Sequence, residues 1–188
     1  MQISAKKSKV MRMGSTKELA VKIEGGNLEI VTRFKYLGAT ITEDAKSVQE
    51  IKIRIAIATS SLAKLKPIWR DKNISMNTRM RLLRALVTSV FLYGCETWTL
   101  NAEMEKRINA FEMNCMRRLL QVHYTSHTPN KQIRELMISY IGEHEHILTI
   151  VKRRQLTWFG HVTRWKGSLE NTMLQGGTDG SRKRGRPI

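Results

Sequence analysis

The chain has 188 residues, 41% of them hydrophobic, which is enough for one domain, or one domain and a small appendage, around a hydrophobic core. Its 33 lysines and arginines outnumber its 16 aspartates and glutamates, which gives a formal net charge of +17 at pH 7. A charge of this size predicts a polyanionic partner, nucleic acid ahead of an anionic membrane surface.

Membrane insertion and secretion are not predicted. The uncharged run over residues 85–95 is far shorter than the roughly 20 residues that a spanning helix needs. No apolar run follows the lysines near the N-terminus, so we see no signal peptide. We therefore expect an intracellular protein, nuclear or cytoplasmic, with no membrane partner.

The first 42 residues are expected to form short strands. Residues 9–13, 19–23 and 28–32 have strand character, and a turn at 25–27 makes the second and third a hairpin. Residues 34–38 lead into another strand at 39–41. Together they predict a small β-meander, which is too small to be stable unless helices pack on it.

Helical periodicity begins after this segment. A first helix is expected from about residue 42 to 66, because apolar residues from Val48 to Leu65 share one face and Pro67 follows. The longest apolar-rich segment, residues 76–98, predicts a central helix capped by Ser75 or Asn77.

Three further helices are expected. Asn101 caps a third, a Thr128-Pro129 pair opens a short one over residues 130–138, and Gly142 separates that from a last helix over 143–164. From residue 176 the tail cannot bury apolar surface and should be disordered. The predicted fold class is mainly α with a small N-terminal β-meander (α+β) and a helical bundle.

Arginines on the central helix have two interpretations. Arg79, Arg81 and Arg84 lie together on its early turns, where they could contact a phosphate backbone, or they could be the solvated edge of a core helix. Lys52 and Arg54 on the first helix belong to the same candidate set.

The carboxylates do not suggest metal-dependent catalysis. Asp44, Asp71 and Asp179 are the only aspartates, and none is paired with another carboxylate on a strand. Nucleotidyl transfer by two metals needs carboxylates that converge on ions about 3.5 to 4 Å apart. We therefore expect no metal site, no cofactor and no catalytic residue in this chain.

Cysteine, histidine and tryptophan side chains could form other kinds of site. Cys95 and Cys115 lie in apolar helical contexts and are expected to be reduced core residues. A zinc site with His123 and His127 is disfavoured because a close cysteine pair is missing. Most tryptophans are expected to be packing residues, with Trp165 the one kept as a possible base-stacking residue.

Several motifs occur in a recognisable order. KKSKVM (6–11) is followed by the hairpin, FKYLG (34–38), a basic helix before Ile68-Trp69, YGCETW (93–98), a Cys-Met-Arg-Arg helix, RRQLTWFGHVTR (153–164) and RGRP (184–187). This order closely resembles the C-terminal part of the endonuclease–reverse transcriptase of non-LTR (LINE-type) retrotransposons. The resemblance covers essentially the whole chain.

The resemblance implies a role for each segment. Lys7 or Lys9 would be the lysine near the incoming nucleotide in the last palm segment. The turn formed by Phe34, Tyr36, Leu37 and Gly38 would be the primer grip, where Gly38 lets the backbone approach nucleic acid closely. The implied division is a palm remnant at 1–42, a thumb-like helical domain at 43–122, a post-thumb helical region at 123–175 and a basic tail at 176–188.

The chain departs from that family in one large respect. The fingers, the endonuclease and the palm strands with the catalytic aspartates would all precede Met1, so magnesium would be needed only by the missing palm. We expect an RNA-directed DNA polymerase fragment that binds the backbone of RNA–DNA or DNA duplexes and does not act as an enzyme by itself.

Two alternatives stay open. In the first, the basic tail binds the A·T minor groove like an AT-hook, through Arg184 and Arg186. In the second, the chain is a helical protein-interaction module that self-associates through exposed apolar surface, because the strands lack sheet partners.

Overall fold

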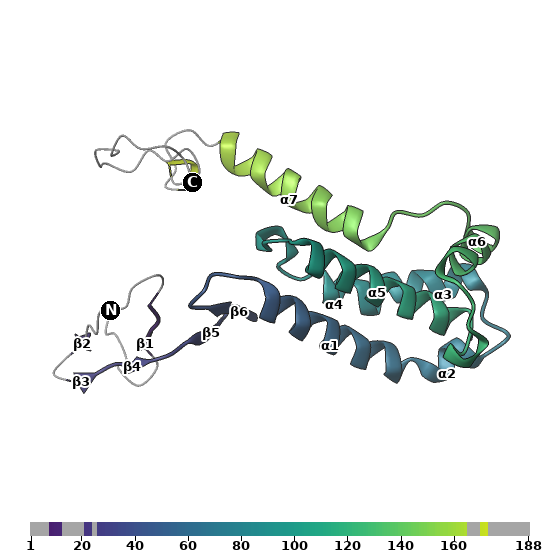
Figure 1. Ribbon diagram of the computed structural model, residues 1–188, viewed down its shortest axis with the longest axis horizontal. Coiled ribbons are helices and arrows are strands. Elements are labelled where there is room, and N and C mark those ends of the chain that lie inside the picture. Colours follow the sequence, from purple (N-terminus) through teal and green to yellow (C-terminus); the bar gives the residue numbers. More distant parts are fainter. Residues whose placement is uncertain (1–7, 13–20, 24–25, 165–169, 173–188) are drawn as a thin grey trace.

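The computed structural model describes residues 8–12, 21–23, 26–164 and 170–172. Short strands lie at one end of the molecule, and a bundle of helices makes up the rest (Figure 1). The predicted fold class, mainly α with a small N-terminal β part, is therefore confirmed.

The N-terminal strands form separate pairs where a single meander was expected. β1 (Lys9–Val10) pairs in parallel with β4 (Glu29–Ile30), and β2 (Lys22–Ile23) pairs antiparallel with β3 (Gly26–Asn27). Residues 26 and 27 were expected in the turn but belong to the second strand of that hairpin. Parallel strands need a long connection, and that β1–β4 pairing could not be read from local sequence.

β5 (Arg33–Tyr36) and β6 (Ala39–Thr42) form an antiparallel hairpin joined by two residues. The register pairs Tyr36 with Ala39, and Arg33 with Thr42. β6 matches the strand predicted at 39–41, whereas β5 was not predicted as a separate strand. The hairpin lies at the start of the helical bundle (Figure 1).

The first helix, α1 (Val48–Lys64), starts about five residues later than predicted. Ala45 has a φ of 52°, which no right-handed helix accommodates. Asp44 instead accepts hydrogen bonds from the Thr42 hydroxyl at 2.6 Å and the Lys46 amide at 3.1 Å. These bonds lower the pKa of the Asp44 carboxyl and stabilise the turn before the helix.

Pro67 does not end the helical region. It lies in the first turn of a short second helix, α2 (Lys66–Arg70), where its missing amide hydrogen costs nothing. The Trp69 indole, 2% exposed, donates to the Leu62 carbonyl at 2.9 Å and fixes α2 against α1.

The central segment is one continuous helical path with a local change of pitch. α3 (Met76–Leu83) continues through a π-helical segment, Arg84–Thr88, into α4 (Ser89–Phe91). Ser75, one of the two predicted caps, accepts a hydrogen bond from the Thr78 amide at 3.2 Å and so caps α3. The helix ends before residue 98, because Gly94 adopts a φ of 69° and a 3₁₀ turn follows at Cys95–Thr97.

The remaining helices lie close to their predicted positions. Asn101 caps α5 (Ala102–Leu119) by accepting from the Met104 amide at 2.9 Å. α6 (Asn130–Ile141) ends at Gly142, whose φ is 74°, and α7 (Ile147–Arg164) follows. A 3₁₀ turn at Tyr124–Ser126 lies between α5 and α6.

α7 begins four residues after its predicted start. Its first amide, that of Ile147, donates to the buried carboxylate of Glu112 on α5 at 2.9 Å, and His146 lies 3.2 Å from the same carboxylate. The negative charge at the start of α7 therefore comes from a different helix, α5.

One apolar core is shared by all the long helices. The Phe91 ring stacks on Phe111 at 5.0 Å and meets Trp98 edge-on at 5.3 Å. Helices on both sides of the predicted boundary at residue 122 contribute to this core. Its most deeply buried members are Ile51, Leu62, Val87, Phe91, Met104, Ile108, Leu119, Ile133, Met137 and Val151.

Candidate nucleic-acid interface

The turn between β5 and β6 is the most distinctive surface feature near the predicted site. Leu37 and Gly38 have φ values of 47° and 83°, the positive pair typical of a type I′ hairpin turn. Glycine adopts this conformation readily, but a leucine in it raises the free energy of the folded state. The Leu37 side chain is nonetheless 75% exposed, and that of Tyr36 is 58% exposed. The tip therefore projects apolar and aromatic surface from a strained backbone.

Two side chains, one from α1 and one from the turn after α4, hold this hairpin turn in place. The Tyr93 hydroxyl donates to the Leu37 carbonyl at 2.6 Å, and Arg54 donates to the Gly38 carbonyl. The Arg54 guanidinium also lies over the Tyr93 ring, 4.5 Å from its centroid. The two carbonyls of the turn are thus bound from α1 and from the end of α4.

Glu50 completes the support. Its carboxylate accepts from the Thr40 amide at 2.7 Å and from Arg54 Nε at 2.6 Å. Glu50 is 4% exposed and Arg54 is 8% exposed, so this is a buried ion pair with its polar atoms occupied. Residues 50 and 54 have the i,i+4 spacing of a helical ion pair, a signal that could have identified them from sequence.

Arg54 is accordingly a correction to the predicted interface. It was expected to face a phosphate backbone, but its guanidinium is buried and bound to the hairpin. Gly38 is needed for its positive φ, and a Cβ at this position would contact the Tyr93 ring at 3.6 Å. The close approach of its backbone to nucleic acid stays a prediction.

The arginines of the central helix divide into two kinds. Arg79 is 8% exposed and donates to the carbonyls of Asp71, at 2.7 Å, and Leu119, at 3.3 Å. It joins α3 to the residue after α2 and to the end of α5, and its predicted contact with a phosphate backbone is corrected. Arg81, Arg84 and Lys52 are exposed and could meet a ligand.

The other predicted residues are placed as follows. Lys9 forms an ion pair with Glu29 at 3.0 Å, and Phe34 is half-buried on β5. Lys7, the alternative to Lys9, lies outside the described residues, as do Trp165 and the AT-hook arginines Arg184 and Arg186.

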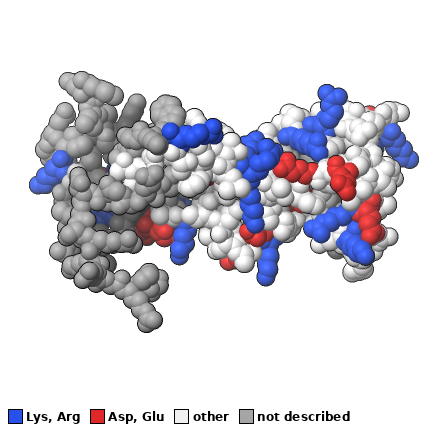
Figure 2. All heavy atoms as spheres, turned by 90° about the horizontal axis from the view of Figure 1, so that it is seen from above, with Lys and Arg blue, Asp and Glu red and all other residues white. Residues whose placement is uncertain are grey.

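Cations on α7 are largely neutralised by carboxylates. Lys152 pairs with Glu105 at 2.7 Å, Arg153 with Glu145 at 2.9 Å and Arg154 with Glu96 at 3.4 Å. Seen from above the view of Figure 1, lysines and arginines are scattered over the surface with carboxylates among them (Figure 2). The consecutive cations Lys152, Arg153 and Arg154 are thus all paired.

With this geometry in view, the chain can be compared with known proteins. No family model and no solved structure matches it. It is 28% identical over 156 residues to an uncharacterized transposon-derived protein of Caenorhabditis elegans. The alignment covers 78% of this chain and 52% of that protein, so the chain spans about half the length of its relative.

Other candidate sites have no support in the part of the chain that the structure describes. No group of three histidine, cysteine, aspartate or glutamate side chains there is arranged to hold a metal ion. Within the same residues, no helix is long and apolar enough to cross a bilayer.

The two cysteines are buried, unpaired thiols, as predicted. Burial, and next the Glu96 carboxylate, raise the pKa of Cys95 to about 11. Burial and the Glu112 carboxylate raise that of Cys115 to about 12. Both are therefore protonated and unreactive at neutral pH. Trp69 and Trp98 are buried, which fits the packing role expected for them.

Proposed function

We propose that this chain is the C-terminal part of a non-LTR retrotransposon reverse transcriptase and binds nucleic acid without catalysing synthesis. The proposal joins the order of motifs along the sequence, the net charge of +17 and the similarity to a transposon-derived protein. The catalytic aspartates, the magnesium that they would hold and the polymerase activity belong to segments that this chain does not contain.

The observation that carries the proposal is the turn at Leu37-Gly38. Its two carbonyls are held by Tyr93 and Arg54, and an exposed leucine sits at a φ that costs free energy. Strain that the surrounding structure maintains is often associated with function. A rigid, projecting tip is suited to positioning a primer end, the role that the resemblance gives to this turn.

The proposal predicts salt-dependent binding with little sequence preference. Because backbone contacts release counterions, the logarithm of the binding constant should fall linearly with the logarithm of salt concentration. Filter binding to an RNA–DNA duplex, with and without EDTA, measures this at several salt concentrations. Steep salt dependence, no effect of EDTA and similar affinity for an unrelated sequence are expected. No binding at low salt would refute the proposal.

A second candidate function is a helical protein-interaction module. Its support is exposed apolar surface on the last two long helices, which comprises Leu136, Ile138, Tyr140, Leu156, Trp158 and Phe159. Self-association that increases with protein concentration in sedimentation velocity, and is lost on Leu156→Glu substitution, would favour this function. A strictly monomeric protein would count against it.

A further inference from the structure

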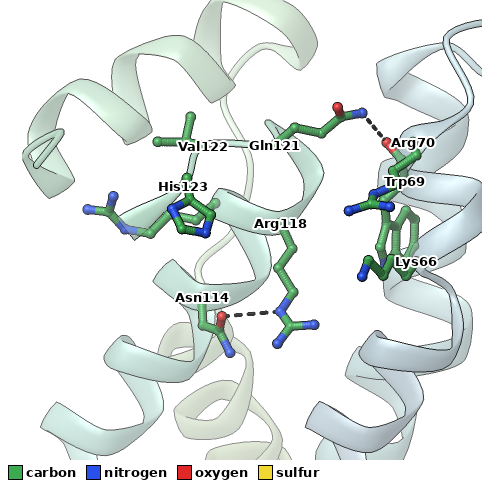
Figure 3. Close-up of a pocket in the computed structure, with 9 residues that line it drawn as sticks. Lys66, Trp69, Arg70, Asn114, Arg118, Gln121, Val122 and His123 are labelled. Carbon is green, nitrogen blue, oxygen red and sulfur yellow. Dashed lines mark hydrogen bonds between the residues drawn. The ribbon is translucent and has the colours of Figure 1, made fainter. Parts of the chain in front are cut away.

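A cavity of about 510 Å³ lies between the ends of α2 and α5, away from the hairpin. Its lining is strongly basic and contains no carboxylate. The lining residues are Lys66, Trp69, Arg70, Asn114, Arg117, Arg118, Gln121, Val122 and His123. Lys66, Arg70 and Arg118 project from two sides into the space between the helices (Figure 3).

The cations of this cavity differ from those on α7 in having no carboxylate partner. None of Lys66, Arg70, Arg117 and Arg118 forms an ion pair with an acidic side chain among the described residues. Like charges gathered in this way repel one another, so the arrangement costs free energy until an anion neutralises it. The cavity thus gathers four cations that no acidic side chain of the described residues neutralises.

Hydrogen-bond donors in the cavity suit a phosphate group. Arg118 uses only Nε within the protein, on the Asn114 side-chain oxygen at 3.4 Å, which leaves its two terminal nitrogens to donate (Figure 3). The same bond orients the Asn114 amide so that its NH₂ is a further donor. Arginine forks bind phosphate oxygens in pairs, and a lysine adds a compact charge.

The walls are fixed, so the cavity is preformed. Arg117 donates to the Thr128 carbonyl at 2.7 Å and to Asn130 at 2.9 Å, which fastens the loop after α5. Gln121 donates to the Trp69 carbonyl and joins the loop to α2 (Figure 3). A preformed site binds its ligand without paying to order these groups.

A second, shallower cavity adjoins the first. It measures about 400 Å³, lies between α1 and α5 and shares Asn114 with the basic cavity. Lys52 lines it, as does Arg107, which is paired with Glu103 at 2.8 Å. The two cavities together follow α1 and α5 from Lys52 to His123. A groove that continues from a basic cavity along two helices fits an extended polyanion, and a nucleic-acid strand has the required shape and charge.

We propose that the cavity between α2 and α5 binds a phosphate group of a nucleic-acid strand. This extends the proposed function, on which it rests for the source of the phosphate, to a site that is separate from the hairpin. Lys66, Arg70 and Arg118 contact the phosphate, and the adjoining cavity receives the next part of the strand.

The test compares two triple variants with the same loss of charge. The first carries Lys66→Gln, Arg70→Gln and Arg118→Gln. The second, its control, carries Lys152→Gln, Arg153→Gln and Arg154→Gln on α7, where each cation is already paired. All six residues lie on the surface or near it, and circular dichroism checks that both variants keep their helices.

Binding of a labelled single-stranded oligonucleotide is measured from 50 to 200 mM salt. Loss of three phosphate-contacting cations should lower the slope of the salt dependence by about 2 and weaken binding at 50 mM by roughly tenfold or more. The α7 variant should change much less. Equal losses in both variants would show that only net charge matters and would overturn the proposal.

A second measurement keeps the cavity testable even if the parent chain binds no nucleic acid. Thermal unfolding is compared in inorganic phosphate and in chloride at equal ionic strength. Phosphate should raise the unfolding temperature of the parent and of the α7 variant, but not that of the cavity variant. Equal stabilisation of all three proteins would overturn the proposal.

The source of the phosphate is checked with vesicles that contain a phosphoinositide. The parent and the cavity variant should bind these vesicles to the same extent in a co-sedimentation assay. If the cavity variant lost vesicle binding and kept its affinity for the oligonucleotide, the site would belong to a lipid headgroup, and the proposal would fail.

Discussion

Leu37 combines two properties that rarely occur in one residue, a positive φ and a side chain that is 75% exposed. A non-glycine residue in this conformation costs about 1–2 kcal/mol, and an exposed leucine repays little of that cost through packing. The hydrogen bond that the Tyr93 hydroxyl donates to the Leu37 carbonyl at 2.6 Å helps to hold Leu37 in this conformation. The choice of leucine at this position is therefore better explained by contact with a partner than by stability.

Leu37→Asn tests that explanation. Asn-Gly is the preferred pair for a type I′ turn, so the variant should be as stable as the parent or more stable by about 0.5–1 kcal/mol in denaturant unfolding. Its affinity for an RNA–DNA duplex should fall several-fold, because the apolar tip is gone. The matched control is Leu156→Asn, another highly exposed leucine, far along the sequence on α7, which should bind like the parent. An unchanged affinity for Leu37→Asn would remove the tip from the interface.

At the scale of a secondary-structure element, α3 shows how neighbouring arginines acquire different roles. Arg79 and Arg81 are two residues apart, so they point in different directions from one helix. Arg79 is turned inward onto the carbonyls of Asp71 and Leu119, whereas Arg81 is exposed. The sequence placed both on the early turns of a basic helix, and only the packing of α5 against α3 separates them.

Alanine substitutions distinguish these roles. Arg79→Ala removes two charge-assisted hydrogen bonds from a buried position, so the free energy of unfolding should fall by about 2–3 kcal/mol. Arg81→Ala should change stability by no more than about 0.5 kcal/mol. Denaturant unfolding measures both. A stable Arg79→Ala variant with weakened nucleic-acid binding would restore Arg79 to the interface.

For the whole molecule, the shared core decides how the chain can be divided. Ile133, Met137, Ile147 and Val151 lie beyond the predicted boundary at residue 122 and are buried with the core of α1 to α5. Gln155 on α7 also donates to the carbonyls of Cys95, at 3.2 Å, and Trp98, at 2.8 Å. The last helices therefore support the loop after α4, and the bundle depends on them.

Removal of residues 123–188 should consequently abolish cooperative folding. Each of the four buried residues contributes about 1.5–3 kcal/mol on burial, and their sum is comparable to the total stability of a typical domain. Urea unfolding of residues 1–122 should give a broad transition, or none, where the full chain gives a sharp one. A sharp transition for the shorter chain would mean that residues 1–122 form an independent domain.

Local signals made the helices and their caps predictable. Ser75 or Asn77 was predicted to cap the central helix, and Asn101 the third, because such side chains can accept from amides near the start of a helix. The structure selects Ser75 and confirms Asn101. The apolar stripe of α5, from Met104 to Leu119, is buried as its spacing predicted. The starts of α1 and α7 were misplaced because a positive φ at Ala45 and a carboxylate from another helix set them.

The sequence by itself determined the helical class, the buried thiols and the large positive charge, because each follows from local spacing or from composition. Only the tertiary structure decided which of those charges are free. Arg54 and Arg79 are bound to backbone carbonyls inside the protein, and three cations of α7 are paired with carboxylates. Lys66, Arg70 and Arg118, from two separate helices, line one cavity without such partners. Whether a cation is neutralised depends on residues far away in the chain, which no local pattern encodes.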